Sequence, residues 1–199
     1  MILDVGCGLR PYEDCFPLSK YIGIDVPVSG REASGKSPDY EFDGTNIPLE
    51  SEHFDVVICT EVLEHAENPD LLLKEMARVT QPGGVLFLTV PFIWGLHELP
   101  YDFRRFTTEG IRKAVEKAGY EVIKQEKLTI GLDAVRLLVA SEINNFLKHH
   151  VDHLERKKMS FRLMIWLQDW LFRILTLVWR RSIRFERIYI DNLIHARKV

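Results

Sequence analysis

The sequence predicts an α/β fold built on a mostly parallel β-sheet. Short apolar or β-branched runs alternate with segments of helical periodicity over roughly the first 130 of its 199 residues. The strongest runs are almost continuously apolar, which is typical of parallel strands buried on both faces. Glycines and acidic residues follow several runs, at the strand ends where parallel sheets bind their ligands.

Seven segments have the composition of strands. Phe54–Thr60 and Val85–Val90 are the strongest, because both are rich in β-branched and large apolar residues. Tyr40–Phe42 is the weakest, and the run that begins at Ile188 would be the last strand. The expected strands cover residues 2–5, 21–24, 40–42, 54–60, 85–90, 120–125 and 188–198.

Two helices between these strands have clear start signals. Asn68 followed by Pro69 is a typical helix start, and we expect this segment to end by Gly83. Thr107 or Thr108 would cap the next helix, and Gly119 would stop it. This alternation of strand and helix is what a parallel sheet with crossover helices requires.

Composition excludes some classes of function. A formal net charge of −3 argues against nucleic acid as the main partner. The three cysteines have no CxxC or zinc-type spacing, and we predict no metal site. The chain opens on a strand rather than on a signal peptide, so we expect free thiols and a cytoplasmic protein.

Polar residues at three strand ends predict a nucleotide site. Gly6 and Gly8 follow the first strand, where glycine permits a tight turn and close approach of a ligand to the backbone. Asp25 ends the second strand, and its carboxylate suits a ribose diol. Asp43 ends the third and would hold an adenine edge, although an ordinary turn-forming Asp-Gly pair explains it equally.

A set of motifs occurs in a fixed order along the chain. They are ILDVGCG at 2–8, IGID at 22–25, DG at 43–44, IPL at 47–49, HFDVV at 53–57, EVLEH at 61–65, RVTQPGG at 78–84 and NLIHARK at 192–198. The set resembles class I S-adenosylmethionine-dependent methyltransferases, most closely the type 11 group of small-molecule enzymes. The resemblance covers roughly residues 1–128 and the C-terminal segment.

The resemblance implies a Rossmann-like sheet of seven strands with an antiparallel last strand, and S-adenosylmethionine as cofactor. The last strand would pair with strand six. The backbone of the first glycine turn would line the methionine and ribose portions, and the carboxylates would bind the ribose and adenine. The cofactor-binding residues that it implies are Asp4, Gly6, Cys7, Gly8, Asp25, Asp43, Gly44, Thr60 and Glu61.

The sequence departs from the family pattern in two places. The family usually has a third glycine where this chain has Arg10, followed by Pro11, so we expect a short or bent first helix. The helices that usually precede the first strand and cover the cofactor are missing from this sequence. Either the chain is truncated, or another segment forms the lid.

Two segments would face the methyl acceptor. His97 follows the fifth predicted strand, and we predict that it is the general base, since an oxygen acceptor benefits from one. The alternative is that His97 and its neighbours only fasten the loop, with an arginine anchoring a carboxylate. The predicted acceptor-binding residues are His65, Tyr101, Asp102, Arg104 and Arg105.

The C-terminal part predicts a helical insertion. We expect residues 1–130 and 186–199 to form the methyltransferase domain, and 131–185 to form an interface, a lid or a membrane-surface element. Residues 161–179 are amphipathic, with tryptophans opposite arginines, in a segment rich in Lys and Arg. The helix would pack on its own domain, on a second subunit as a homodimer, or on the inner face of a membrane.

Three classes of function remain in order of preference. The first is an enzyme that methylates a small-molecule, glycan or lipid-linked acceptor. The second is a non-catalytic, cofactor-binding or scaffold protein that acts through the insertion. The third, an NAD-type oxidoreductase, ranks low because its third glycine would fall on Pro11.

Overall fold

The structure is a computed structural model that describes residues 1–27, 38–150, 166–167, 170–172, 174 and 187–199. The chain divides into two compact units. The first unit comprises Met1–Phe92, Leu96–Glu126 and Asp191–Val199, and the second comprises Ile93–Gly95 and Lys127–Ile190.

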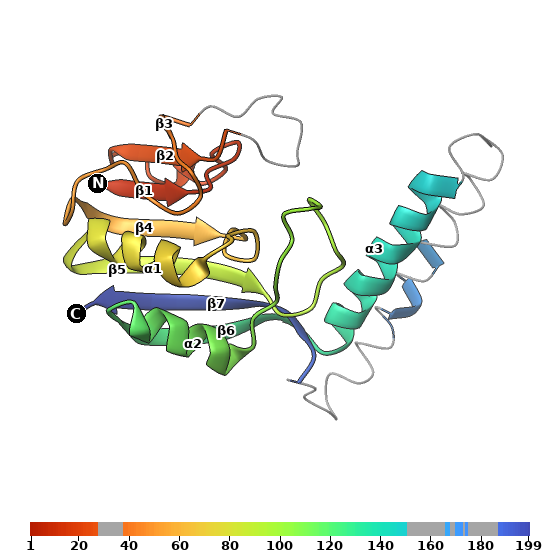
Figure 1. Ribbon diagram of the computed structural model, residues 1–199. Coiled ribbons are helices and arrows are strands. Elements are labelled where there is room, and N and C mark those ends of the chain that lie inside the picture. The colour runs from red at the N-terminus through yellow and green to blue at the C-terminus, as the bar shows by residue number, and fades with distance from the viewer. Residues whose placement is uncertain (28–37, 151–165, 168–169, 173, 175–186) are drawn as a thin grey trace. The chain divides into compact units, whose positions relative to one another are not determined.

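A seven-stranded sheet runs through the described residues in the order β3-β2-β1-β4-β5-β7-β6 (Figure 1). Its strands are β1 (Ile2–Val5), β2 (Tyr21–Asp25), β3 (Tyr40–Glu41), β4 (Phe54–Thr60), β5 (Thr80–Pro91), β6 (Tyr120–Ile130) and β7 (Tyr189–Lys198). β1 to β5 pair in parallel, whereas β7 runs antiparallel to β5. The predicted fold class is therefore confirmed, with β7 lying between β5 and β6.

β5 and β6 differ most from their predicted bounds, and β6 continues to Ile130 instead of ending near Gln125. β5 begins at Thr80, which pairs with Phe54 across an irregularity in the register, and then continues through Gly83 and Gly84. These glycines are part of a strand, so the preceding helix ends at Val79 rather than near Gly83. Glycine is a weak strand former, and this made the start of β5 resemble a turn.

Helices α1 (Pro69–Val79) and α2 (Thr108–Lys117) pack against the same face of the sheet (Figure 1). The Asn68 side chain accepts a hydrogen bond from the Leu71 amide, and Thr107 accepts one from Gly110. Both predicted N-caps are confirmed. Apolar residues of the two helices meet the sheet in one core cluster, which includes Leu72, Leu73, Met76, Ile111 and Val115.

The connection from β1 to β2 contains no α-helix in the structure. A single 3₁₀ turn, Glu13–Cys15, occupies this link, which agrees with the expectation of a short first helix. Arg10, where the family usually has glycine, adopts a φ of 56°, in the left-handed region that glycine favours. Its guanidinium lies over the Tyr21 ring and pairs with Asp39 at 3.1 Å.

Not all of the strongly apolar strands are buried on both faces, and this expectation is corrected for β5. β1 and β2 are buried throughout, but β5 alternates: Leu86 and Leu88 are buried and Phe87 is 42% exposed. Phe87 stacks on His195 of β7 at 4.8 Å between ring centroids. The helices α1 and α2 cover one face of these strands, and the other face has no such cover among the described residues.

The second unit contains helix α3 (Leu132–His150). The Gly131 amide donates to the Ile188 carbonyl at 2.7 Å, so the chain leaves and returns at neighbouring points. Most of the predicted amphipathic segment 161–179 lies outside the described residues. None of the helices that the structure describes is both long and apolar enough to span a bilayer.

Candidate active site

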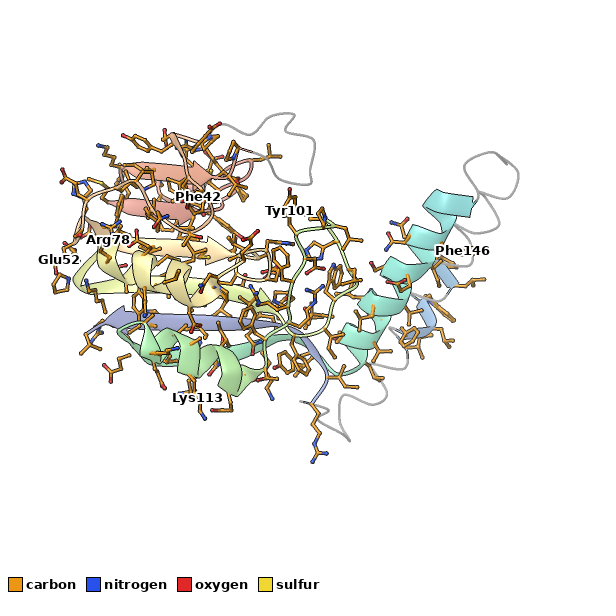
Figure 2. The ribbon with its side chains drawn as sticks, viewed as in Figure 1. Phe42, Glu52, Arg78, Tyr101, Lys113 and Phe146 are labelled. Carbon is orange, nitrogen blue, oxygen red and sulfur yellow. The ribbon has the colours of Figure 1, made fainter. Side chains whose placement is uncertain are left out.

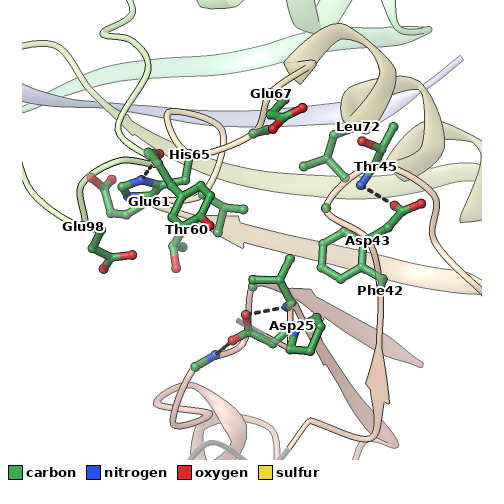
Figure 3. Close-up of a pocket in the computed structure, with 18 residues that line it drawn as sticks. Asp25, Phe42, Asp43, Thr45, Thr60, Glu61, His65, Glu67, Leu72 and Glu98 are labelled. Atoms are coloured by element: carbon green, nitrogen blue, oxygen red, sulfur yellow. Dashed lines mark hydrogen bonds between the residues drawn. The ribbon is translucent and has the colours of Figure 1, made fainter. Parts of the chain in front are cut away.

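A cavity of about 420 Å³ lies at the carboxyl ends of β1, β2 and β4 (Figure 3). The parallel pairing of these strands brings their C-terminal residues to one edge of the sheet, as the sequence predicted. The wall consists of Gly6, Gly8, Asp25, Val26, Pro27, Phe42, Asp43, Gly44, Thr45, Thr60, Glu61, Val62, His65, Ala66, Glu67, Leu72, Glu98 and Tyr101.

The first glycine turn forms one wall of the cavity. Gly6 has a φ of +72°, and a Cβ built there would lie 2.4 Å from a methyl carbon of Val62. Gly8 has a φ of +51°, and a Cβ there would meet nothing within 4 Å. Position 6 is therefore closed to any side chain by its neighbour, while position 8 faces open space in which a ligand can approach the backbone.

Asp25 stands at the end of β2 and is 5% exposed. Its Oδ2 accepts a hydrogen bond from the Gly8 amide at 2.9 Å, and its Oδ1 accepts one from Val26 at 2.8 Å. These bonds fix the carboxylate and link the glycine turn to β2 (Figure 3). Each carboxylate oxygen has a second lone pair, which suits the hydroxyls of a diol.

The next part of the wall is apolar. The rings and methyl groups of Phe42, Leu72 and Val26 line it, and Phe42 and Leu72 are buried. Asp43 lies beside them, but its oxygens accept hydrogen bonds from Thr45 and Asn46 at 2.6–2.8 Å. The contacts of Asp43 in this structure are therefore those of a turn-forming aspartate. The sequence did not single out Phe42 or Leu72, because an apolar wall residue looks like any core residue.

Two predicted cofactor residues lie behind the cavity and not on its wall. Asp4 is 1% exposed and accepts a hydrogen bond from the Tyr21 hydroxyl. Desolvation by burial raises the pKa of Asp4 to about 6, despite that hydrogen bond. The Cys7 side chain packs under Gly23, where an added Cβ would lie 2.8 Å from its Sγ. Burial raises the pKa of this thiol to about 12, so it is not a nucleophile.

The end of β4 supplies a polar section of the wall. Thr60 and Glu61 line it, and Glu61 adopts a φ of 54°, which is uncommon for a residue other than glycine. The Glu61 amide donates to the Thr89 carbonyl at 3.1 Å, which ties this turn to β5. Desolvation raises the pKa of the Glu61 carboxyl, although the residue as a whole is exposed.

The predicted base, His97, is paired with His65. Their Nε2 atoms are 3.2 Å apart, and the rings meet edge to face. His65 lines the cavity, whereas His97 is not part of its wall. Tyr101 lines the cavity too, and lies on the loop between β5 and α2 (Figure 2). Of the predicted acceptor residues, the structure brings only His65 and Tyr101 to the wall.

The other three predicted acceptor residues hold the loop together. Asp102 has no exposed side-chain surface, and the Arg105 guanidinium donates to both of its oxygens, at 2.5 and 2.8 Å. That arginine lowers the pKa of Asp102 to about 2. Arg104 donates to the carbonyls of Ala66 and Glu67. These contacts match the alternative interpretation, in which the loop residues fasten the loop and an arginine anchors a carboxylate.

Glu64 is the site residue that the sequence analysis did not select. It lies next to His65 in the turn before α1, not in a helix, and its side chain is 0% exposed. Neither carboxylate oxygen has a hydrogen-bond partner among the described residues. Desolvation raises its pKa to about 8, and the nearby Glu61 carboxylate adds to the shift. Only its place in the EVLEH motif marked it in the sequence.

Residues 3–88 match a protein family whose description is a methyltransferase domain, of type 11. These residues include β1, the glycine turn, β2 and β4, and therefore most of the cavity wall. The match ends within β5, before the loop that carries His97.

Curated relatives match over less than half of the chain. A ubiquinone biosynthesis O-methyltransferase of Hahella chejuensis (strain KCTC 2396) is 38% identical over 102 residues, which cover 44% of this chain and 42% of that protein. Its counterpart in Maricaulis maris (strain MCS10) is 31% identical over 98 residues, which cover 43% and 38%. The chain thus spans about two fifths of the length of these relatives.

Solved structures share the fold. The [4+2]-cyclase SpnF superposes with a TM-score of 0.63 at 18% identity, covering 99% of this chain and 74% of SpnF. A Haemonchus contortus phosphoethanolamine N-methyltransferase 2, solved with S-adenosylhomocysteine, gives 0.57 at 17% identity, covering 99% and 48%. In its sheet order, its strand-end cavity and the matched residues 3–88, the chain is similar to the class I methyltransferases of the type 11 group.

Proposed function

We propose that this chain transfers a methyl group from S-adenosylmethionine to an oxygen atom of a small molecule. The observation that carries the proposal is the composition of one cavity. Its wall combines a glycine turn held to Asp25 with an imidazole, His65, and a phenol, Tyr101. The first pair suits a nucleoside, and the second suits a hydroxylated acceptor.

The residues present fit the cofactor. Gly8 leaves open space over its backbone, Asp25 offers carboxylate oxygens to ribose hydroxyls, and Phe42 and Leu72 form an apolar wall for adenine. When bound, the cofactor supplies a methyl group activated by a sulfonium. The chain then has to position the acceptor in line and exclude water, and alignment of this kind is worth about 7–11 kcal/mol of the barrier.

An oxygen acceptor is favoured for two reasons. The curated relatives reported above are O-methyltransferases by name. In addition, the acceptor end of the wall contains an imidazole, and a hydroxyl must lose its proton as the oxygen attacks a methyl carbon. A glycan or a lipid-linked molecule with a free hydroxyl would satisfy the same chemistry.

Within this proposal, His65 contacts the acceptor, and His97 contacts His65 and shares the proton that His65 takes up. His65 stands on the cavity wall, and its Nε2 faces the Nε2 of His97 at 3.2 Å. A proton taken from the acceptor at His65 would be shared with the second ring. Base assistance of this type contributes roughly 10²–10⁴-fold to the rate.

Calorimetric titration with S-adenosylhomocysteine, with NAD as the control ligand, tests the cofactor site. We expect micromolar binding of S-adenosylhomocysteine alone, and loss of it in Asp25→Ala. Binding that is unchanged in Asp25→Ala, or no binding by the folded protein, would contradict the proposal. A screen of hydroxylated acceptors with radiolabelled cofactor would then measure transfer itself.

The histidine pair gives a prediction on turnover. His97→Ala should lower kcat by roughly 10²-fold or more, because the second ring can no longer share the proton, while S-adenosylhomocysteine binds as before. Single-turnover kinetics and calorimetry on the same preparation measure the two effects. A kcat equal to that of the unmodified chain would exclude His97 from the reaction.

A further inference from the structure

Three side chains from two parts of the chain converge beside the cavity. Glu64 and His65 come from the turn before α1, and His97 comes from the loop after β5. One ligand-type atom of each, a carboxylate oxygen and two ring nitrogens, lies within 4.8 Å of the others. We call these three residues the EHH cluster.

The contacts of His65 fix its protonation. Its Nδ1 lies 2.8 Å from the Tyr101 carbonyl oxygen, which can only accept a hydrogen bond. Nδ1 therefore carries the ring's proton, and in the neutral imidazole Nε2 presents a lone pair. That lone pair points into the cluster, 3.2 Å from His97 Nε2 and 3.7 Å from a Glu64 oxygen.

His97 is oriented in a similar way. Its Nδ1 lies 3.3 Å from the Asp102 carboxylate, and its backbone amide donates to the same carboxylate at 3.0 Å. A carboxylate accepts hydrogen bonds, so these two contacts favour a proton on Nδ1 of the ring. Two Nε2 lone pairs would then face each other, which is unfavourable unless a positive charge lies between them.

Glu64 adds a carboxyl group at the same point. Its side chain is fully buried, and its two oxygens lack hydrogen-bond partners among the described residues. Ionisation of such a buried carboxyl is unfavourable without a partner, and a bound cation would be that partner. The other charged groups that act on Glu64 are Glu61, Asp102 and Arg105, so carboxylates outnumber cations around it.

We propose that the EHH cluster binds a divalent first-row transition-metal ion, with Zn²⁺ or Mn²⁺ as the leading candidates. Two imidazoles and one carboxylate form a ligand set that these ions accept. Nitrogen ligands about 2.05 Å from a tetrahedral ion lie about 3.3 Å apart, close to the 3.2 Å between the two Nε2 atoms. The Tyr101 carbonyl and the Asp102 carboxylate face the outer nitrogen, Nδ1, of each ring, and partners of this kind orient metal-binding histidines.

The site opens toward the cavity, since His65 is part of its wall. Three protein ligands leave at least one coordination position, and an oxygen of a small molecule in the cavity would occupy it. If the proposed function holds, this oxygen is the acceptor's, and the ion takes over from the imidazole pair the task of lowering the pKa of the hydroxyl.

Metal content tests the proposal without any assay of transfer. Full-length protein is stripped with a chelator, and Zn²⁺, Mn²⁺ and Co²⁺ are titrated into it by calorimetry. We expect one ion per chain to bind, with Co²⁺ producing the visible absorption of a mixed nitrogen and oxygen site. His65→Ala and His97→Ala should each lose this ion, and Glu64→Gln, which keeps the shape of the buried side chain, should weaken binding at least tenfold.

His53→Ala is the matched control, because His53 is exposed and precedes β4, at the opposite end of that strand from Glu61. It should bind the ion as the unmodified chain does, and the remaining histidines are common to all variants. Equal binding in the control and in all three cluster variants would overturn the proposal. So would a stripped, folded protein that takes up no ion, with nitrogen NMR placing a shared proton between the two Nε2 atoms.

The two proposals fail separately. Metal uptake without binding of S-adenosylhomocysteine would contradict the proposed function and leave the EHH site in place. Cofactor binding without metal uptake would contradict the EHH site and leave the proposed function in place. The histidine pair would then accept the acceptor's proton without a metal ion.

Discussion

At the residue scale, Gly6 and Gly8 share a motif but have different physical tasks. Both adopt positive φ, yet only Gly6 is enclosed, by Val62, while Gly8 faces the open cavity. Sequence alone could not separate them, since the distinction depends on a residue more than fifty positions away. The same holds for Asp4, whose partner Tyr21 belongs to the next strand.

Substitution of Gly6 by alanine should destabilise the fold. The new Cβ would contact Val62, and the positive φ adds strain, so the free energy of unfolding should fall by about 2–4 kcal/mol. Urea denaturation measures this loss. The double variant Gly6→Ala/Val62→Ala should recover part of it.

Gly8→Ala is the comparison for that experiment. It should cost only about 1 kcal/mol of backbone strain but weaken S-adenosylhomocysteine binding, because its methyl group occupies cavity space. A Gly8 variant that binds normally, or a Gly6 variant as stable as the parent, would refute the assignment of the two positions.

Asp4 should make stability depend on pH. Its pKa is raised from 3.8 to about 6 in the folded chain, so folding favours the protonated form. The sign follows: the folded state binds the proton more tightly, and stability falls as pH rises from about 4 through 6. The full penalty, present above pH 6, is on the order of 3 kcal/mol.

Asp4→Asn removes this titration. Relative to the unmodified chain, it should be more stable at pH 8 and nearly equal at pH 4, as urea denaturation at both values would measure. The asparagine oxygen can still accept from the Tyr21 hydroxyl. A difference that does not change with pH would mean that Asp4 keeps an ordinary pKa.

At the element scale, the strands and helix caps were predictable because their signals are local. β4 matches its predicted bounds, and Asn68 and Thr107 cap their helices as expected. The start of β5 was not predictable, since Gly83 and Gly84 become strand only through pairing with β4. The orientation of the ionisable side chains in the loop after β5 was not predictable for the same reason. Which of them face the cavity depends on long-range contacts.

The loop from Phe92 to Thr107 offers a prediction at this scale. Arg104 donates to the Ala66 and Glu67 carbonyls, and so joins the loop to the turn before α1. Arg104→Ala should raise amide exchange in the loop and increase the acceptor's KM several-fold, with S-adenosylhomocysteine affinity unchanged. Arg112→Ala, on α2, is the control, because its side chain bonds Gln125 instead.

Exchange rates that rise equally in both of these variants would show a general loss of stability rather than release of the loop. A fall in cofactor affinity in Arg104→Ala alone would show that the loop also supports the nucleotide end of the cavity.

At the scale of the whole molecule, the fold class followed from the order of the motifs, but the proposed metal ligands did not. The prediction of no metal site came from the spacing of the cysteines, none of which belongs to the EHH cluster. In the EHH cluster, two ligands are adjacent and the third lies 32 positions away, on a loop whose course the sequence does not define. Buried groups without partners are visible only after folding.

The insertion gives the last prediction, at the same scale. The Gly131 amide bonds the Ile188 carbonyl at 2.7 Å, so a short Asn-Gly turn should join β6 to β7 in place of residues 132–187. The membrane-surface element is one of the three alternatives for the insertion. On that alternative the full chain should sediment with anionic liposomes at low salt, and the shortened chain should not. Both should bind S-adenosylhomocysteine with similar affinity. If neither chain sediments, membrane binding by the insertion is excluded. If the shortened chain loses cofactor binding, the insertion is instead part of the cofactor site.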